Sequence, residues 1–135
     1  MVDEGMSEAS DSGIVSKIFE GSVDDAVERL VQLVRDRGMT VCAIVDHSEE
    51  AHRLDLTLRD TTVVIFGSPV AGTPVMQAHP LTALGLPLKV LAWDDEGQTK
   101  ISYLDPGVLA LRHRLAPELT ARLAGIGPLT DERVA

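Results

Sequence analysis

The residues best suited to ligand chemistry follow a short apolar run in the middle of the chain. Residues 63–66 are apolar, a turn rich in Gly and Pro follows them, and the turn leads into a helix start. This pattern predicts a buried strand that ends at a helix N-terminus, where backbone N–H groups and the helix dipole favour anions. His47 also follows a predicted strand, and we expect it at the same end of the sheet. The candidate ligand-binding residues are Gly67, Ser68, Gly72, Thr73, Met76 and His47.

Turn chemistry gives a second interpretation of the same segment. Gly-Ser-Pro at residues 67–69 and Ala-Gly-Thr-Pro at residues 71–74 are typical of turns. The segment matches neither a phosphate-binding P-loop nor a dinucleotide fingerprint, because no Gly-Lys-Ser/Thr follows Gly72. A structural turn and a ligand site therefore both stay open.

The histidines offer a metal or haem site as an alternative function, with His47, His79 and His113 as ligands. The chain has four histidines and no Cys-x-x-Cys or His-Glu-x-x-His motif. Met76 and His79 share one face of a predicted helix, which suits a soft metal, although a helical Met more often packs in a core. The leading interpretation therefore has no metal and no cofactor.

An enzyme with a site near Ser68 is the other alternative. The sequence around Ser68 departs from the Gly-x-Ser-x-Gly nucleophile motif, and Pro69 lacks the N–H that an oxyanion hole would use. Asp46 and His47 are adjacent, so a strand would point their side chains to opposite sides. Cys42 lies in an apolar strand, where we expect an inert thiol. The sequence thus favours a protein without catalytic activity.

Composition excludes several classes of protein. The chain has 135 residues, of which 44% are hydrophobic and 24% charged, as in globular domains. A net charge of −9 argues against nucleic acid and anionic membranes as partners. The lone Cys42 cannot form an intramolecular disulfide, no apolar run is long enough to span a bilayer, and the acidic N-terminus is the reverse of a signal peptide. These features predict a cytoplasmic protein.

Hydrophobic periodicity predicts alternating strands and helices. The clearest helix begins after Ser22 and stops at Gly38, with an apolar stripe at helical spacing. A second helix, with Thr73 as its N-cap, is expected to break near His79, and residues 88–93 and 99–103 form a hairpin. We expect strands at residues 13–20, 39–45 and 61–66, and a last helix after residue 105. The order favours a single α+β domain, with a mixed β-sheet of about five strands and helices packed mainly on one face.

Four pieces of the chain form a distinctive series. They are Gly-Met-Thr-Val to Ile-Val-Asp-His (38–47), Ile-Phe-Gly-Ser-Pro with Gly-Thr-Pro-Val-Met (65–76), Leu-Pro-Leu-Lys-Val-Leu-Ala-Trp-Asp (86–94), and Tyr-Leu-Asp-Pro with Leu-Ala-Leu-Arg-His (103–113). In their order and spacing these pieces resemble the family catalogued as domain of unknown function 302. The resemblance covers residues 13–115 and implies a small, usually bacterial, α+β domain that forms dimers, with no established reaction. Members often have Asn where this chain has Ser68.

These observations divide the chain into a disordered acidic tail (1–12), the α+β domain (13–115) and a short C-terminal helical extension (116–135). A small domain often leaves an apolar sheet face or edge that needs cover, which also favours a homodimer. We therefore expect a homodimeric module that binds a small molecule or acts as an accessory to another protein.

Overall fold

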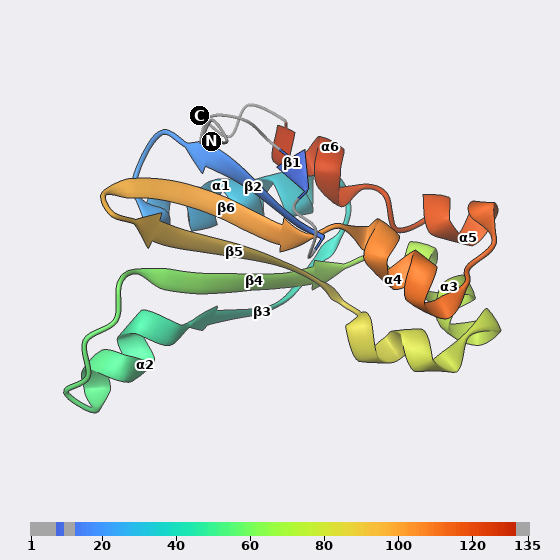
Figure 1. The fold of residues 1–135 in the computed structure, drawn as a ribbon, viewed down its shortest axis with the longest axis horizontal. Helices are drawn as coiled ribbons and strands as arrows, with labels where there is room; N and C mark the ends of the chain where they lie inside the picture. Colours follow the sequence, from blue (N-terminus) through green and yellow to red (C-terminus); the bar gives the residue numbers. More distant parts are fainter. Residues whose placement is uncertain (1–7, 10–12, 132–135) are drawn as a thin grey trace.

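One antiparallel sheet carries the fold in the computed structural model, which describes residues 8–9 and 13–131 (Figure 1). Its six strands lie in the order β1-β2-β6-β5-β4-β3. The α+β class and the single domain predicted from sequence are confirmed. In chain order the strands are β1 (Glu8–Ala9), β2 (Ile14–Phe19), β3 (Thr40–Asp46), β4 (Thr61–Gly67), β5 (Leu88–Asp95) and β6 (Gln98–Leu104).

The sheet differs from the mixed one that we expected, because every strand pairing in the described residues is antiparallel. Residues 47–60 join β3 to β4, and α2 (His47–Arg53) occupies the first half of them. This connection does not carry the chain back along a face of the sheet. The chain leaves β3 and enters β4 at the same end, where Asp46 pairs with Thr62, so the two strands run in opposite directions.

The remaining helices lie on one face of the sheet or beyond one end of it. Pro80 ends α3 near His79 as predicted, but the helix begins earlier than expected, with Ser68 rather than Thr73 as N-cap. Both sites pair a hydroxyl residue with a following Pro, and the helix starts at the one next to β4. These helices are α1 (Val23–Asp36), α3 (Pro69–Ala78), the 3₁₀ helix η1 (Pro80–Gly85), α4 (Pro106–His113), α5 (Pro117–Ala121) and α6 (Ile126–Asp131).

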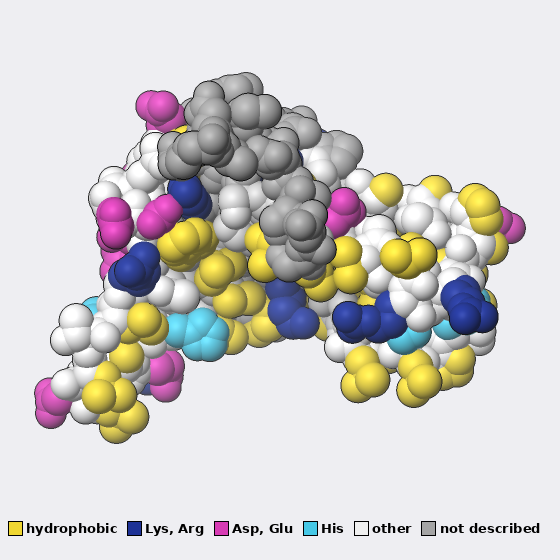
Figure 2. Space-filling view, viewed as in Figure 1, with side chains coloured by type: hydrophobic (Ala, Val, Ile, Leu, Met, Phe, Trp, Pro, Cys, Tyr) yellow, Lys and Arg dark blue, Asp and Glu magenta, His cyan; other side chains and the backbone are white. Residues whose placement is uncertain are grey.

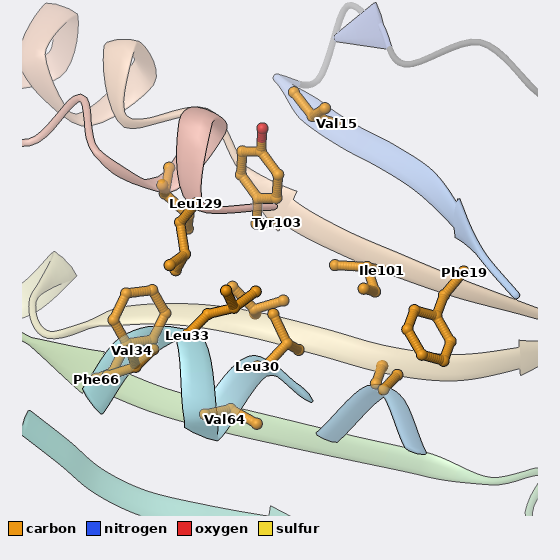
Figure 3. Close-up of a cluster of buried hydrophobic side chains, with 14 of the residues drawn as sticks. Val15, Phe19, Leu30, Leu33, Val34, Val64, Phe66, Ile101, Tyr103 and Leu129 are labelled. Atoms are coloured by element: carbon orange, nitrogen blue, oxygen red, sulfur yellow. The ribbon is translucent and has the colours of Figure 1, made fainter. Parts of the chain in front are cut away.

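The main core lies between α1 and one face of the sheet (Figure 3). Ser22 caps α1, as its sequence predicted, and it also forms a reciprocal capping box with Asp25. The helix buries one apolar face against strands β4, β5 and β6, and α6 adds two more buried side chains beside it. The buried hydrophobic residues of the two helices are Val23, Ala26, Leu30, Leu33 and Val34 from α1, and Ile126 and Leu129 from α6.

A lysine on the helix-covered face joins α6 to the sheet. Lys17 Nζ donates to Thr130 Oγ1 at 2.6 Å and to the Gly127 carbonyl at 3.1 Å, and it lies 5.3 Å from the centre of the Tyr103 ring. These contacts offset the free-energy cost of removing the Lys17 ammonium from water beside the core. The last helix is thereby fixed over β2 and β6.

The other face of the sheet has no helix over its middle strands, and hydrophobic side chains gather on it (Figures 1 and 2). Strand register places Val63 opposite both Val45 and Leu91 on this face, and Trp93 opposite Lys100. Trp93 Nε1 donates to Ser102 Oγ at 2.9 Å. We call this surface, formed by Val45, Val63, Ile65, Leu91 and Trp93, the open sheet face.

The two ends of the chain differ in how much of their predicted division into a tail and an extension falls within the described residues. Of the tail at residues 1–12, only Glu8–Ala9 belong to the described residues, where they form β1 against β2, and the rest of that prediction lies outside them. The expected C-terminal extension contains α5 and α6 up to residue 131. Leu129 in α6 is 0% exposed and belongs to the main core.

The burial of Leu129 gives a test of whether α6 is part of the domain. We expect Leu129→Ala to lower the free energy of unfolding by about 2–5 kcal/mol, because it removes a buried side chain and leaves a cavity. Leu111→Ala, at a position 81% exposed, should change it by less than about 0.5 kcal/mol. Urea denaturation of both variants makes the comparison, and equal effects would contradict a core role for α6.

Candidate ligand pocket

An apolar pocket of about 400 Å³ opens at the end of the sheet where β4 finishes. It lies between the start of β3, the end of β4, the start of β5, the helices α3 and η1, and the segment that joins α5 to α6. The candidate residues Gly67, Ser68, Gly72, Thr73 and Met76 all line it. The structure therefore brings five of the six sequence-predicted residues into one cavity, and whether they bind a ligand stays a prediction.

The end of β4 and the start of α3 form one wall of the pocket. Ser68 Oγ accepts a hydrogen bond from the Ala71 N–H at 3.3 Å and so caps α3. A Cβ on Gly67 would lie 3.4 Å from the Pro87 side chain, at the close limit of ordinary van der Waals contact. Gly72 is roomier, since its nearest neighbours would be Met76 at 3.8 Å and Leu86 at 4.0 Å. A larger side chain at position 72 would therefore enter the pocket.

Sequence analysis missed the opposite wall. Leu123 and Ile126 belong to the segment that we placed outside the domain, although both are buried. In the sequence they are two apolar residues three positions apart after Pro117, and a pattern this short does not indicate a core position. The other apolar wall residues that were not predicted are Met39, Phe66, Pro69, Ala71, Ala83, Leu86, Pro87 and Leu88.

Arg122 is the charged residue of the pocket lining, and sequence analysis missed it too. It follows α5, and its Nη1 lies 3.4 Å from the Val70 carbonyl at the start of α3. This contact is at the long limit of a hydrogen bond and is therefore weak. The guanidinium thus reaches from one side of the pocket to the other.

Cys42 also lines the pocket, and its setting differs from the buried strand position that we expected. The register of β3 against β4 shifts between Val41 and Ala43, so Cys42 lies in a bulge of an edge strand. Its thiol is exposed and makes only a long 3.9 Å contact with the Thr40 carbonyl. Edge bulges re-aim side chains in this way.

His47 lies at the other end of the sheet, so the expected proximity to Gly67 is wrong. Because β3 and β4 are antiparallel, Thr40 pairs with Gly67 while Asp46, just before His47, pairs with Thr62. Asp46 caps α2 there, accepting from Ser48 Oγ at 2.6 Å and from the Glu49 N–H at 2.9 Å. These hydrogen bonds, that of Ser48 first, hold the pKa of the Asp46 carboxyl below its ordinary value of 3.8.

The three histidines of the metal alternative are not brought together. His47 begins α2, His79 follows α3 and His113 ends α4. In the part of the chain that the structure describes, no three His, Cys, Asp or Glu side chains form a group able to hold a metal ion. The His79 carbonyl instead accepts from Thr82 Oγ1 at 2.6 Å, a turn contact.

The enzyme alternative finds no support in the pocket lining. Among the described residues that line it there is no His, Asp, Glu or Lys to serve as a general base for Ser68. The Ser68 hydroxyl is used as the cap of α3. The lining is apolar apart from a few hydroxyls, the Cys42 thiol and the Arg122 guanidinium.

A small antiparallel α+β domain with an end pocket is thus the class of protein that the fold and site define. The chain belongs to the family described as domain of unknown function DUF302, whose model matches residues 15–127. The match runs beyond Leu115, where the resemblance seemed to stop, and reaches α6. The fold is similar to that of a crystal structure of an uncharacterized conserved DUF302 protein from Bacillus stearothermophilus, with a TM-score of 0.78 and 19% identity over 90% of this chain and 95% of that one.

The chain is also similar to curated Brucella proteins. It is 35% identical over 130 residues to fluoride-specific ion channel FluC 1 of Brucella suis, and equally similar to FluC 1 of Brucella abortus. The match covers 93% of this chain but only 51% and 48% of those proteins, so the chain spans about half their length. Among the described residues of this chain, no helix is both long and apolar enough to cross a membrane.

Proposed function

We propose that this chain is a homodimeric module that binds a small, mainly apolar molecule in the end pocket. The observation that carries the proposal is the pocket itself, a cavity of about 400 Å³ with almost entirely apolar walls. Small-molecule sites are commonly about 300–1,000 Å³ and are lined by apolar side chains with a few polar groups. The pocket has this size and composition. The polar side-chain groups of its lining are a few hydroxyls, one thiol and one guanidinium.

The open sheet face supports the homodimeric part of the proposal. Val63 and Leu91 lie opposite each other in the middle of this face, and both are only partly buried. Exposed apolar patches of this kind usually mark interaction sites. A second copy placed face to face would cover this patch on both subunits, as a two-fold symmetric dimer does.

The cytoplasm is the proposed location of the module, and nucleic acid is not among its proposed partners. The net charge of −9 opposes binding to a phosphate backbone. The exposed Cys42 is compatible with a reducing compartment, where thiols stay free.

Filling the pocket tests the binding function. We expect the wild-type protein to bind the neutral dye aminoanthracene saturably, as followed by fluorescence. Gly72→Leu should lower the affinity by roughly tenfold or more, because the leucine side chain would occupy the space of the dye. Gly72→Ala is the matched control, since its added Cβ meets only ordinary contacts. Unchanged dye affinity in a folded Gly72→Leu protein would contradict the pocket as the binding site.

The dimer is tested by placing a charge on the open sheet face. We expect the wild type to be a dimer in sedimentation velocity, and Leu91→Glu to raise its dissociation constant by roughly thirtyfold or more, because the carboxylate would be buried without a partner. Gln77→Glu adds the same charge at an exposed position of α3 and should leave the dimer intact. A wild-type monomer, or a Leu91→Glu dimer of unchanged affinity, would contradict this interface.

An accessory role beside a membrane channel is a second candidate function. The observation that favours it is the match to about half of proteins named fluoride-specific ion channels. We propose that the matched half is the non-channel part of those proteins and that it modulates the other half.

This role is tested in a fluoride-sensitive bacterium that expresses only the unmatched half of the Brucella suis protein. Co-expression of this chain should improve growth at inhibitory fluoride concentrations, and co-expression of Gly72→Leu should improve it less. Identical growth with and without this chain, at equal levels of the channel half, would contradict the accessory role.

A further inference from the structure

We infer that the pocket takes a small monocarboxylic acid, whose hydrocarbon part lies among the apolar walls and whose carboxylate pairs with Arg122. This inference rests on the proposed binding function and names its class of ligand. It comes from the charge at the pocket mouth, which neither the family nor the relatives assign.

The guanidinium of Arg122 lies at the pocket mouth, where its contacts with the rest of the protein are weak. Its Nη1 makes a weak 3.4 Å approach to the Val70 carbonyl. A guanidinium has five N–H donors in a planar fork, so most of its donor capacity faces outward or into the pocket. No acidic side chain of the described residues forms an ion pair with it. The position suits an incoming anion.

The neighbourhood of Arg122 strengthens the preference for a negative group. The described pocket lining contains no Asp or Glu, although the chain has 21 acidic residues against 12 basic ones. Val70, which Arg122 approaches, is in the first turn of α3, where the helix dipole is positive. Thr73, further along the same helix, also lines the pocket and offers a hydroxyl. The charge at the mouth is therefore opposite to that of the protein as a whole.

The apolar walls limit which anion fits. A phosphate group carries more charge than one guanidinium can balance, and its desolvation beside Leu86 and Leu123 would be costly. A carboxylate carries a single charge and matches the guanidinium fork with two parallel hydrogen bonds. The cavity of about 400 Å³ has room for a hydrocarbon chain attached to that carboxylate. An aliphatic monocarboxylic acid meets all three conditions.

Displacement of aminoanthracene by matched amphiphiles tests this inference. Octanoate, octanol and octylamine share one hydrocarbon chain and differ in their head group. We expect octanoate to displace the dye from the wild-type protein at roughly tenfold lower concentration than octanol, since a hydrogen bond to a charged group adds about that factor. Octylamine should be the weakest of the three.

Substitution of Arg122 assigns the preference to its side chain. Arg122→Gln should remove the preference for octanoate, which is measured within each variant as the ratio of the octanol and octanoate concentrations that displace the dye. Arg122→Lys should retain part of it, and Arg112→Gln, at an exposed position outside the pocket, should retain all of it.

The outcomes separate this inference from the binding function. If octanol and octanoate compete equally in the wild type, or if Arg122→Gln keeps the preference, the carboxylate inference is overturned and the pocket still binds. If the dye does not bind, or if Gly72→Leu binds all ligands as the wild type does, the proposed pocket function itself fails and the inference fails with it. A preference for octanoate that is lost in Arg122→Gln and kept in Arg112→Gln supports both the binding function and the carboxylate inference.

Discussion

The packing of α1 on one face of the sheet is the constraint on which the rest of the structure depends. A helix with its side chains is about 10–12 Å wide, whereas six strands spaced about 4.8 Å apart span about 24 Å. The single stripe of α1 therefore cannot cover the whole face. The core is completed by α6, which Lys17 ties to β2 through Thr130 and Gly127. With α1 and α6 on one face, the middle of the other is left without a helix.

The same constraint explains why a pocket forms at the end of the sheet. The helices α3, α4 and α5 lie beyond one end of the sheet and pack around a second, smaller cluster of Val75, Leu109 and Leu123. Phe66 and Ile126 belong to the main cluster and Leu123 to the second, and all three line the cavity. The pocket is therefore the seam between two hydrophobic clusters. The side chains at the seam pack closely against their own cluster, and this close packing does not continue from one cluster to the other.

Local patterns predicted the parts of the fold that local chemistry determines. The stripe and capping residues of α1, the β5–β6 hairpin and the break at Pro80 are all confirmed, and Gly67 to Met76 gathered in one place because they are near neighbours in sequence. Strand direction was not predictable, since the connection of residues 47–60 is long enough for either a parallel or an antiparallel return, and this error misplaced His47. Arg122, which follows α5, and Ile126 of α6 reach the pocket through long-range packing, for which the sequence offers no periodicity. A charged residue near two apolar residues is also common in surface helices, so this pattern does not indicate a pocket.

The central claim is that the seam between the two clusters is a ligand site. Methionine methyl NMR tests it most directly, because Met39 and Met76 line the pocket from β3 and α3 sides respectively. During titration with octanoate, we expect the methyl signals of both residues to shift together and to saturate at one ligand per chain. Signals of Met39 and Met76 that stay unchanged while octanoate is added to excess would contradict the account.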